Sequence, residues 1–358
     1  MVRAMMKLNA PLHVLFLLAL AACKPVSISG DDSQPVIEYD DSESDADTDA
    51  DADTDTDTDA DGDSVIDDTS PPIDYDCEAL PDFNLGDTTL TEARAYHGIA
   101  FTQDGYLVGW NGYNAVVRSS YDGVREVFVP GVLGMEQLDH LADGDIVGSD
   151  TSGARLIRIT ADGGTETIST NSGYAYGVTT GPDRNIYIAD GGVHRIDIET
   201  GEKTTLIRQP RQWTAHSLAF NLDSTRLYIG SIGRGDVYYV DLDDDLNPVG
   251  EPQIFASNVG RGWHDGLGFD ACGNLYVADY SSAGLYRVSP EGVITPMYNP
   301  GNTTIYGHGL QWGNGQGGWR ADALYLPMPY SGSLVREVVV GVPAGDFLRT
   351  WRGEPAPW

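Results

Sequence analysis

A strand–turn–strand pattern that returns about every 40 residues is the feature that most constrains this chain. The first copy is YHGIAFTQDGYLVGW, residues 96–110. Five further copies begin at Met135, Ala175, Ala215, His264 and, interrupted by an insertion, Gly307. Equivalent positions are 39, 40, 40, 49 and 43 residues apart. Repeats of this period built from short strands are typical of β-propellers, so the sequence predicts an all-β fold with six blades.

Each repeat divides into four short strands separated by turns rich in glycine and aspartate. In the first repeat the expected strands are HGIAF, YLVGW, AVVRSS and VREVFV. Two stretches exceed the pattern, DLDDDLNPVGEPQIF in the fourth repeat and GNGQGGWRAD in the sixth, and both are expected to be surface loops. The strand that closes the ring comes either from TTLTEARA, before the first blade, or from FLRTW near the C-terminus.

The N-terminus has the pattern of a secretory signal peptide. Residues 1–22 combine a basic start at Arg3 and Lys7 with an apolar run too short to span a bilayer. The run ends in Leu-Ala-Ala-Cys, which resembles a bacterial lipobox with Cys23 as the lipidated residue; an ordinary signal peptide is the alternative. We therefore expect an extracytoplasmic protein anchored to a bacterial membrane, and Lys24 after the cysteine favours the outer membrane.

Residues 23–76 form the second expected segment, an acidic and disordered linker. Between Asp31 and Asp68 there are 18 acidic residues and no lysine or arginine, against a net charge of −33 for the whole chain. Such a segment buries too little apolar surface to fold, and its charges repel one another. The stretch 57–68 partly matches a calcium loop, but a solvated run of charge accounts for it better. The acidic balance also excludes nucleic acid as a partner.

The propeller is assigned to residues 77–358, and it contains two further cysteines. In a compartment that permits disulfides, Cys77 and Cys272 are expected to pair and to fix the start of the domain to its fifth repeat. Two free thiols are the alternative. We expect the propeller to be a monomer.

One position of the repeat concentrates groups capable of binding metals or carrying protons. It is the second residue of each copy, and the residues there, which we call the column residues, are His97, Glu136, Tyr176, His216, Asp265 and His308. Because the inner strand of each blade runs along the central channel, these residues should converge at one channel mouth. Imidazoles and carboxylates suit a divalent metal, with zinc favoured and calcium or manganese as alternatives. The candidate ligands are His97, Glu136, His216, Asp265 and His308.

A second interpretation of the column residues is purely structural. In a regular strand each of them shares a side with the apolar residue two positions later, and could therefore pack between blades. Aromatic residues near the same positions, Tyr96, Trp213 and Trp263, could stack on a sugar or an apolar ligand, or could equally belong to the core.

The repeat resembles that of the senescence-marker-protein and gluconolactonase family of six-bladed propellers, which is related to NHL-repeat proteins. The strongest match is HDGLGFDACGNLYVADY, whose Asp265 corresponds to the aspartate that binds metal and acts as base in that family. The family's other two ligands, an asparagine and a glutamate, fall at His216 and His97. The resemblance implies a metal-dependent lactonase or esterase.

A weaker resemblance is to the peptidyl-hydroxyglycine amidating lyase, a six-bladed propeller with a three-histidine zinc site. It rests on the strand starts at His97, His216 and His308, although two blades separate the first two of these residues.

Two functions are therefore open. The first is a metal-dependent hydrolase or lyase acting at the channel mouth, with Asp265 as base and Tyr176 as a hydrogen-bonding partner of the substrate. The second is a non-catalytic propeller that binds a small molecule or a protein partner at the cell surface.

Overall fold

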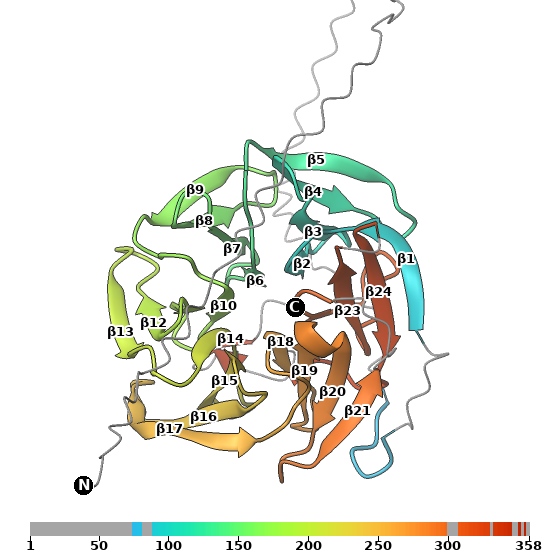
Figure 1. The fold of residues 1–358 in the computed structure, drawn as a ribbon. Helices are drawn as coiled ribbons and strands as arrows, with labels where there is room; N and C mark the ends of the chain where they lie inside the picture. Colours follow the sequence, from blue (N-terminus) through green and yellow to red (C-terminus); the bar gives the residue numbers. More distant parts are fainter. Residues whose placement is uncertain are drawn as a thin grey trace, which may run out of the picture. The chain divides into compact units, whose positions relative to one another are not determined.

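Six four-stranded antiparallel sheets form the blades of a β-propeller around a central channel (Figure 1). The computed structural model describes residues 74–80, 88–298, 307–329, 332–345, 350–351 and 354–355. The predicted signal peptide, Cys23 and nearly all of the acidic linker lie outside the described residues. In the described part of the chain no helix is long and apolar enough to cross a membrane.

The blades follow the order of the repeats. The first blade consists of β2 (Ile99–Phe101), β3 (Leu107–Trp110), β4 (Ala115–Ser119) and β5 (Arg125–Pro130). The second consists of β6 (Leu138–His140), β7 (Ile146–Asp150), β8 (Arg155–Ile159) and β9 (Thr165–Ser169). The third consists of β10 (Gly177–Thr180), β11 (Ile186–Ala189), β12 (Val193–Ile196) and β13 (Lys203–Ile207). The fourth blade consists of β14 (Thr214–Phe220), β15 (Arg226–Ile232), β16 (Val237–Leu242) and β17 (Pro248–Ala256). The fifth consists of β18 (His264–Phe269), β19 (Leu275–Asp279), β20 (Gly284–Val288) and β21 (Ile294–Tyr298).

The sixth blade closes the ring with a strand from the start of the domain. It contains β22 (Gln311–Trp312), β23 (Ala323–Met328), β24 (Leu334–Val339) and, as its outer strand, β1 (Thr88–Arg94). Strand β1 pairs antiparallel with β24, and Figure 1 shows it along the outer edge of that strand. The segment before the first blade therefore supplies the closing strand. Near the C-terminus, β25 (Thr350–Trp351) pairs with β26 (Glu354–Pro355) and with no other described strand.

The two long stretches differ from their prediction as surface loops. The excess length of the fourth repeat lies in β17, a nine-residue outer strand that pairs with β16 back to Leu242. In the sixth repeat, Trp319 is fully buried between the last blade and the first, where its ring lies 5.1 Å from that of Phe101. Its indole nitrogen also donates a hydrogen bond of 2.9 Å to the carbonyl of Gly105. A large aromatic ring in the insertion is the reason that this loop enters the core.

Apolar side chains fill the six seams between neighbouring blades. Each buried cluster draws on two successive blades, and together the clusters cover all six junctions, including that between the sixth blade and the first. The alternation of each strand places one set of side chains in each of the two adjoining seams. The three-residue 3₁₀ helix η2 (Tyr280–Ser282) lies between β19 and β20.

Glycines bring the inner strands unusually close at three seams. Gly98, Gly177 and Gly266 each follow a column residue, and a Cβ added to any of them would lie 2.5–2.7 Å from the backbone of the next inner strand. No larger residue fits there without displacing the strand. This backbone contact draws the preceding column residues together.

A disulfide joins Cys77 to Cys272 across 195 residues. It fixes the segment before β1 to the turn between β18 and β19. The pairing is the one expected from the sequence.

Candidate functional site at the channel mouth

Two column residues lie at β-bulges at the start of their inner strands. In β14 the pairing with β15 skips His216, and in β18 the pairing with β19 skips Asp265. A bulged residue is released from the regular alternation, so its side chain can be directed differently from that of its strand neighbours. Both side chains consequently meet those of other blades at the channel mouth.

Asp265 is the centre of the site. Its carboxylate lies between two imidazoles: Oδ1 is 3.2 Å from Nδ1 of His216, and Oδ2 is 2.8 Å from Nδ1 of His308. Oδ2 is buried and makes no hydrogen bond of standard geometry among the described residues, so its close contact with His308 is its main polar interaction there. A carboxylate this deeply buried, with a side chain only 8% exposed, requires polar partners, and the two imidazoles provide them.

A second pair of imidazole and carboxylate lies on the neighbouring side of the mouth. Nδ1 of His97 contacts Oε2 of Glu136, and the hydroxyl of Tyr174 donates a hydrogen bond of 3.1 Å to Oε1. Both oxygens of Glu136 are therefore engaged, and the carboxylate is held in one orientation.

Ring contacts link the two pairs into a closed circuit. His97 stacks on His308 at 4.4 Å between centroids, and Tyr176 stacks on His216 at 4.6 Å. Tyr174 contacts Tyr176 at 4.8 Å. All six column residues thus converge at one mouth, and Tyr174 completes the circuit between Glu136 and Tyr176.

The pKa values in this circuit differ in direction. Burial alone would raise the pKa of Asp265, but its contacts with His308 and the charges of His308, His216 and His97 outweigh burial and lower it. For Glu136 too, burial raises the pKa and the hydrogen bond and charge of His97 more than offset that effect. Burial lowers the pKa of His216, despite the opposing charge of Asp265. At neutral pH the two carboxylates are therefore ionised and His216 is neutral.

The tautomer of His216 follows from its partners. Its Nδ1 lies 3.1 Å from the carbonyl oxygen of His264 and 3.2 Å from the carboxylate of Asp265, and both of these groups only accept hydrogen bonds. Nδ1 therefore carries the proton. The basic nitrogen of His216 is Nε2.

The column residues offer imidazoles and carboxylates, the ligand types of a divalent metal. Yet among the described residues no group of three or more His, Cys, Asp or Glu side chains could hold a metal ion. The imidazoles face the carboxylates in pairs and do not share a common centre. The described arrangement does not fit a resident metal, and no step below depends on one.

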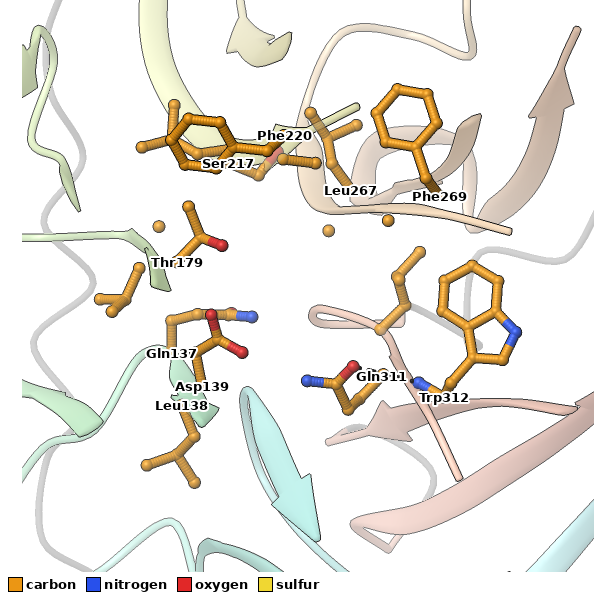
Figure 2. Close-up of a pocket in the computed structure, with 17 residues that line it drawn as sticks. Gln137, Leu138, Asp139, Thr179, Ser217, Phe220, Leu267, Phe269, Gln311 and Trp312 are labelled. Atoms are coloured by element: carbon orange, nitrogen blue, oxygen red, sulfur yellow. Dashed lines mark hydrogen bonds between the residues drawn. The ribbon is translucent and has the colours of Figure 1, made fainter. Parts of the chain in front are cut away.

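Below the mouth the channel narrows to a small polar cavity. Figure 2 shows Gln137, Asp139, Thr179 and Gln311 around a shared space whose volume is about 40 Å³. This volume holds roughly three water molecules. This cavity is suited to water and not to an organic molecule.

The mouth is rimmed with exposed aromatic rings. Trp263 is 38% exposed and lies 6.2 Å from the ring of His216, and Tyr174 is 49% exposed. Tyr96 stacks on His97. Trp213, in contrast, is buried against Tyr238 and belongs to the core.

Several features of the site could not be found in the sequence by column alignment. Tyr174 lies two residues before the column residue Tyr176, and its hydrogen bond to Glu136 of the neighbouring blade depends on contacts that the repeat does not report. His264, beside Asp265, is fully buried; its Nε2 donates to the carbonyl of Val259 and its Nδ1 accepts from the backbone N–H of Ser231. It fixes the start of β18. The glycine that follows several column residues is the one sequence feature that could have indicated the close approach of the inner strands.

Fold and site together define a six-bladed β-propeller with paired imidazoles and carboxylates at an aromatic channel mouth. No protein-family model matches the sequence, and no curated protein sequence matches it. Solved structures do share the fold.

A gluconolactonase from Xanthomonas campestris is similar with a TM-score of 0.58 and 17% identity, over 76% of this chain and 94% of its own. Regucalcin from Agrobacterium tumefaciens, a calcium-binding protein, has a TM-score of 0.57 and 17% identity, over 73% of this chain and 95% of its own. An auxiliary nutrient binding protein from Bacteroides thetaiotaomicron has a TM-score of 0.54 and 12% identity, over 74% and 75%. The chain thus has the propeller fold seen in gluconolactonases and regucalcin.

Proposed function

We propose that the protein is a hydrolase or lyase whose active site is the channel mouth. The observation that carries the proposal is the buried carboxylate of Asp265 between the imidazoles of His216 and His308. A neutral imidazole oriented by an ionised carboxylate is the arrangement of a general base.

In ester or lactone hydrolysis, Nε2 of His216 removes a proton from water as the water oxygen attacks the carbonyl carbon. Asp265 stabilises the imidazolium that forms. The bond from the carbonyl carbon to the leaving oxygen then breaks, and the imidazole of His97, which contacts Glu136, is assigned as the donor of a proton to that oxygen. Asp265 is therefore assigned a positioning role, in place of the base role implied by the family resemblance. Tyr176 keeps its predicted role as a hydrogen-bonding partner of the substrate.

The test is a comparison of two histidine variants on a panel of sugar lactones and 4-nitrophenyl esters. His216→Ala should lower kcat/KM by about 10²-fold or more, the usual contribution of a general base. The control is His194→Gln: this histidine lies on β12, the third strand of its blade, and pairs with Asp190 instead of a column residue, so its loss should leave kcat/KM within about twofold. No turnover of any panel member, or equal losses in both variants, would remove the catalytic proposal.

The divalent metal predicted from the residue types remains a separate hypothesis. A metal would supply a Lewis acid and an acidic water at the mouth. The proposed steps need only side chains of this chain, so turnover should survive dialysis against a chelator. One equivalent of zinc, calcium or manganese that is lost on His216→Ala, together with loss of turnover in chelator, would favour the metal-dependent enzyme instead.

Ligand binding without catalysis is the second candidate function. The exposed rings of Trp263 and Tyr174 favour it, because such rings stack on sugars and apolar ligands. The fold shared with a nutrient binding protein is compatible with it. Ligand binding without turnover would establish this function.

We also propose that the propeller is anchored to the bacterial outer membrane through lipidated Cys23. The support is the lipobox pattern that ends at this residue. Cys23→Ala should move the protein from the membrane fraction to the soluble fraction. An unchanged membrane fraction would contradict the anchor, and separation of inner from outer membranes would identify the destination.

A further inference from the structure

Four exposed arginines lie on the loops that surround the mouth end of the fourth blade. Arg208 and Arg211 belong to the loop between β13 and β14, Arg234 to the loop between β15 and β16, and Arg261 to the loop between β17 and β18. In a chain with only 21 basic residues and a net charge of −33, this grouping is unexpected.

Backbone contacts bring these loops together. The N–H of Gly233 donates to the carbonyl of Gly262 at 2.9 Å, and the N–H of Val259 donates to that of Gly235 at 2.8 Å. The carbonyl oxygen of Gln212 lies 3.7 Å from the position of a Cβ on Gly233. Arg211, Arg234 and Arg261 therefore lie on adjoining loops, whereas Arg208 is at the outer end of its loop.

The same loops lead directly to the proposed active site. Trp263, two residues after Arg261, lies 6.2 Å from His216, and its backbone pairs with that of Ile232, just before Arg234. A ligand stacked on Trp263 would thus lie beside His216 and next to the loops that carry Arg234 and Arg261.

No acidic side chain neutralises the arginines. Among the described residues none of the four guanidinium groups has a hydrogen bond or an ion pair, whereas Arg118, Arg155, Arg158 and Arg226 all pair with carboxylates. Three carboxylates lie nearby and have other partners. Asp279 accepts from the backbone of Arg261 and Trp263, Asp190 pairs with Lys203, and the buried Asp236 accepts a hydrogen bond of 3.4 Å from the hydroxyl of Tyr238. The accessible charge on this side of the mouth is therefore positive.

We propose that Arg211, Arg234 and Arg261 form a subsite, the arginine rim, for an anionic carboxylate or phosphoryl group of the ligand that binds at the mouth. The proposal rests on the mouth being the ligand site and adds the substrate class, an anionic molecule with a ring or apolar part for Trp263. Guanidinium groups bind both oxyanions in a bidentate manner, and their positive field attracts an anion that the rest of the surface repels.

The test is calorimetric binding of two probes that share a ring and differ in charge, 4-nitrobenzoate and 4-nitrobenzyl alcohol. The full chain should bind the carboxylate roughly tenfold more tightly than the alcohol, as expected for about one charge-assisted hydrogen bond. The double variant Arg234→Gln/Arg261→Gln should lose this preference and retain its affinity for the alcohol. Its melting temperature should not change, because both side chains are exposed and make no hydrogen bond or ion pair with described residues.

Arg125→Gln is the matched control, since Arg125 is an exposed arginine on the first blade. It should keep the preference. Displacement of 4-nitrobenzoate by millimolar inorganic phosphate would identify a phosphoryl ligand, and no displacement would identify a carboxylate. Equal affinities for the two probes, no measurable binding of 4-nitrobenzoate, or a preference lost only in Arg125→Gln would overturn the arginine rim. The binding assay is independent of turnover, so the two proposals can fail separately. Turnover with no preference for the carboxylate probe would reject only the arginine rim. A preference for the carboxylate probe with no turnover would reject only the catalytic proposal.

Discussion

His140 shows how a single buried group couples this fold to pH. It lies at the end of β6, and its Nε2 is 2.8 Å from the carbonyl oxygen of Phe101 in the first blade. Burial lowers the pKa of this imidazole from 6.5 to about 4. The residue therefore links two inner strands in its neutral form.

This shift predicts acid sensitivity of the fold. Between about pH 6.5 and 4 the unfolded chain binds a proton at this position and the folded chain does not, so stability falls as the pH falls through that range. The full loss is at most roughly 3 kcal/mol, since one pKa unit corresponds to about 1.4 kcal/mol. Chemical denaturation at several pH values should show a shallower loss for His140→Gln than for the native chain. Parallel pH profiles would contradict this assignment.

The sequence predicts which residues occupy the equivalent position of each repeat, but it does not predict the directions in which their side chains point. The repeat aligns His216 and Asp265 at one position, and that alone predicts a shared mouth. The bulges at both residues depend on strand pairing, which no local pattern in the sequence reports. The pairing of imidazoles with carboxylates likewise depends on contacts between blades, and for this reason residue types alone suggested a metal.

At the scale of the structural element, the insertion of the sixth blade acts as a wedge in the closing seam. Trp319 contacts Phe101 and Tyr121 of the first blade and Tyr325 of its own. A composition rich in glycine and polar residues predicts an exposed loop. The buried ring reverses that expectation.

Trp319→Ala should therefore lower the free energy of unfolding by about 3–5 kcal/mol, the usual cost of removing a large buried aromatic ring. Trp263→Ala is the control, because its ring is 38% exposed, and it should cost much less. Denaturant unfolding of both variants is the measurement. Similar losses would show that Trp319 does not support the closing seam.

The glycine contacts make a second prediction at this scale. A Cβ on Gly177 would lie 2.5 Å from the carbonyl oxygen of His216, so Gly177→Ala should displace the fourth inner strand and cost about 1–3 kcal/mol. Turnover or ligand binding at the mouth should fall with it. Gly153→Ala, where the added Cβ would meet only the flexible side chain of Arg155, should change neither property. Unaltered behaviour of Gly177→Ala would show that the strands can separate freely.

At the scale of the whole molecule, the ring is secured twice near its start, by β1 in the sixth blade and by the disulfide to the fifth. The number of blades follows from the repeat, and the cysteine pairing was expected from the secretory pattern of the N-terminal sequence. The identity of the closing strand does not follow from the sequence, because two segments of similar β-propensity could have paired with the edge of β24. The pairing with β24 and the packing of Ala93 and Ala95 in the last seam identify β1 as the closing strand.

Removal of the disulfide should destabilise the whole ring. Cys77→Ser/Cys272→Ser should lower the free energy of unfolding by about 2–4 kcal/mol, because the link restricts a long loop in the unfolded chain. Reductant should destabilise the native chain and leave the double variant unchanged. An unfolding midpoint shared by all these samples would mean that β1 alone secures the ring.

Because of the glycines beside the column residues, the spacing of the inner strands at the mouth does not depend on which side chains occupy the column positions. Main-chain contact at Gly98, Gly177 and Gly266 sets how far apart the inner strands stand, whatever side chains precede them. Exchanges among the six column residues can therefore change what the mouth binds without altering its diameter. The propeller should for this reason be a good starting scaffold for selecting new specificities from libraries randomised at those six positions alone.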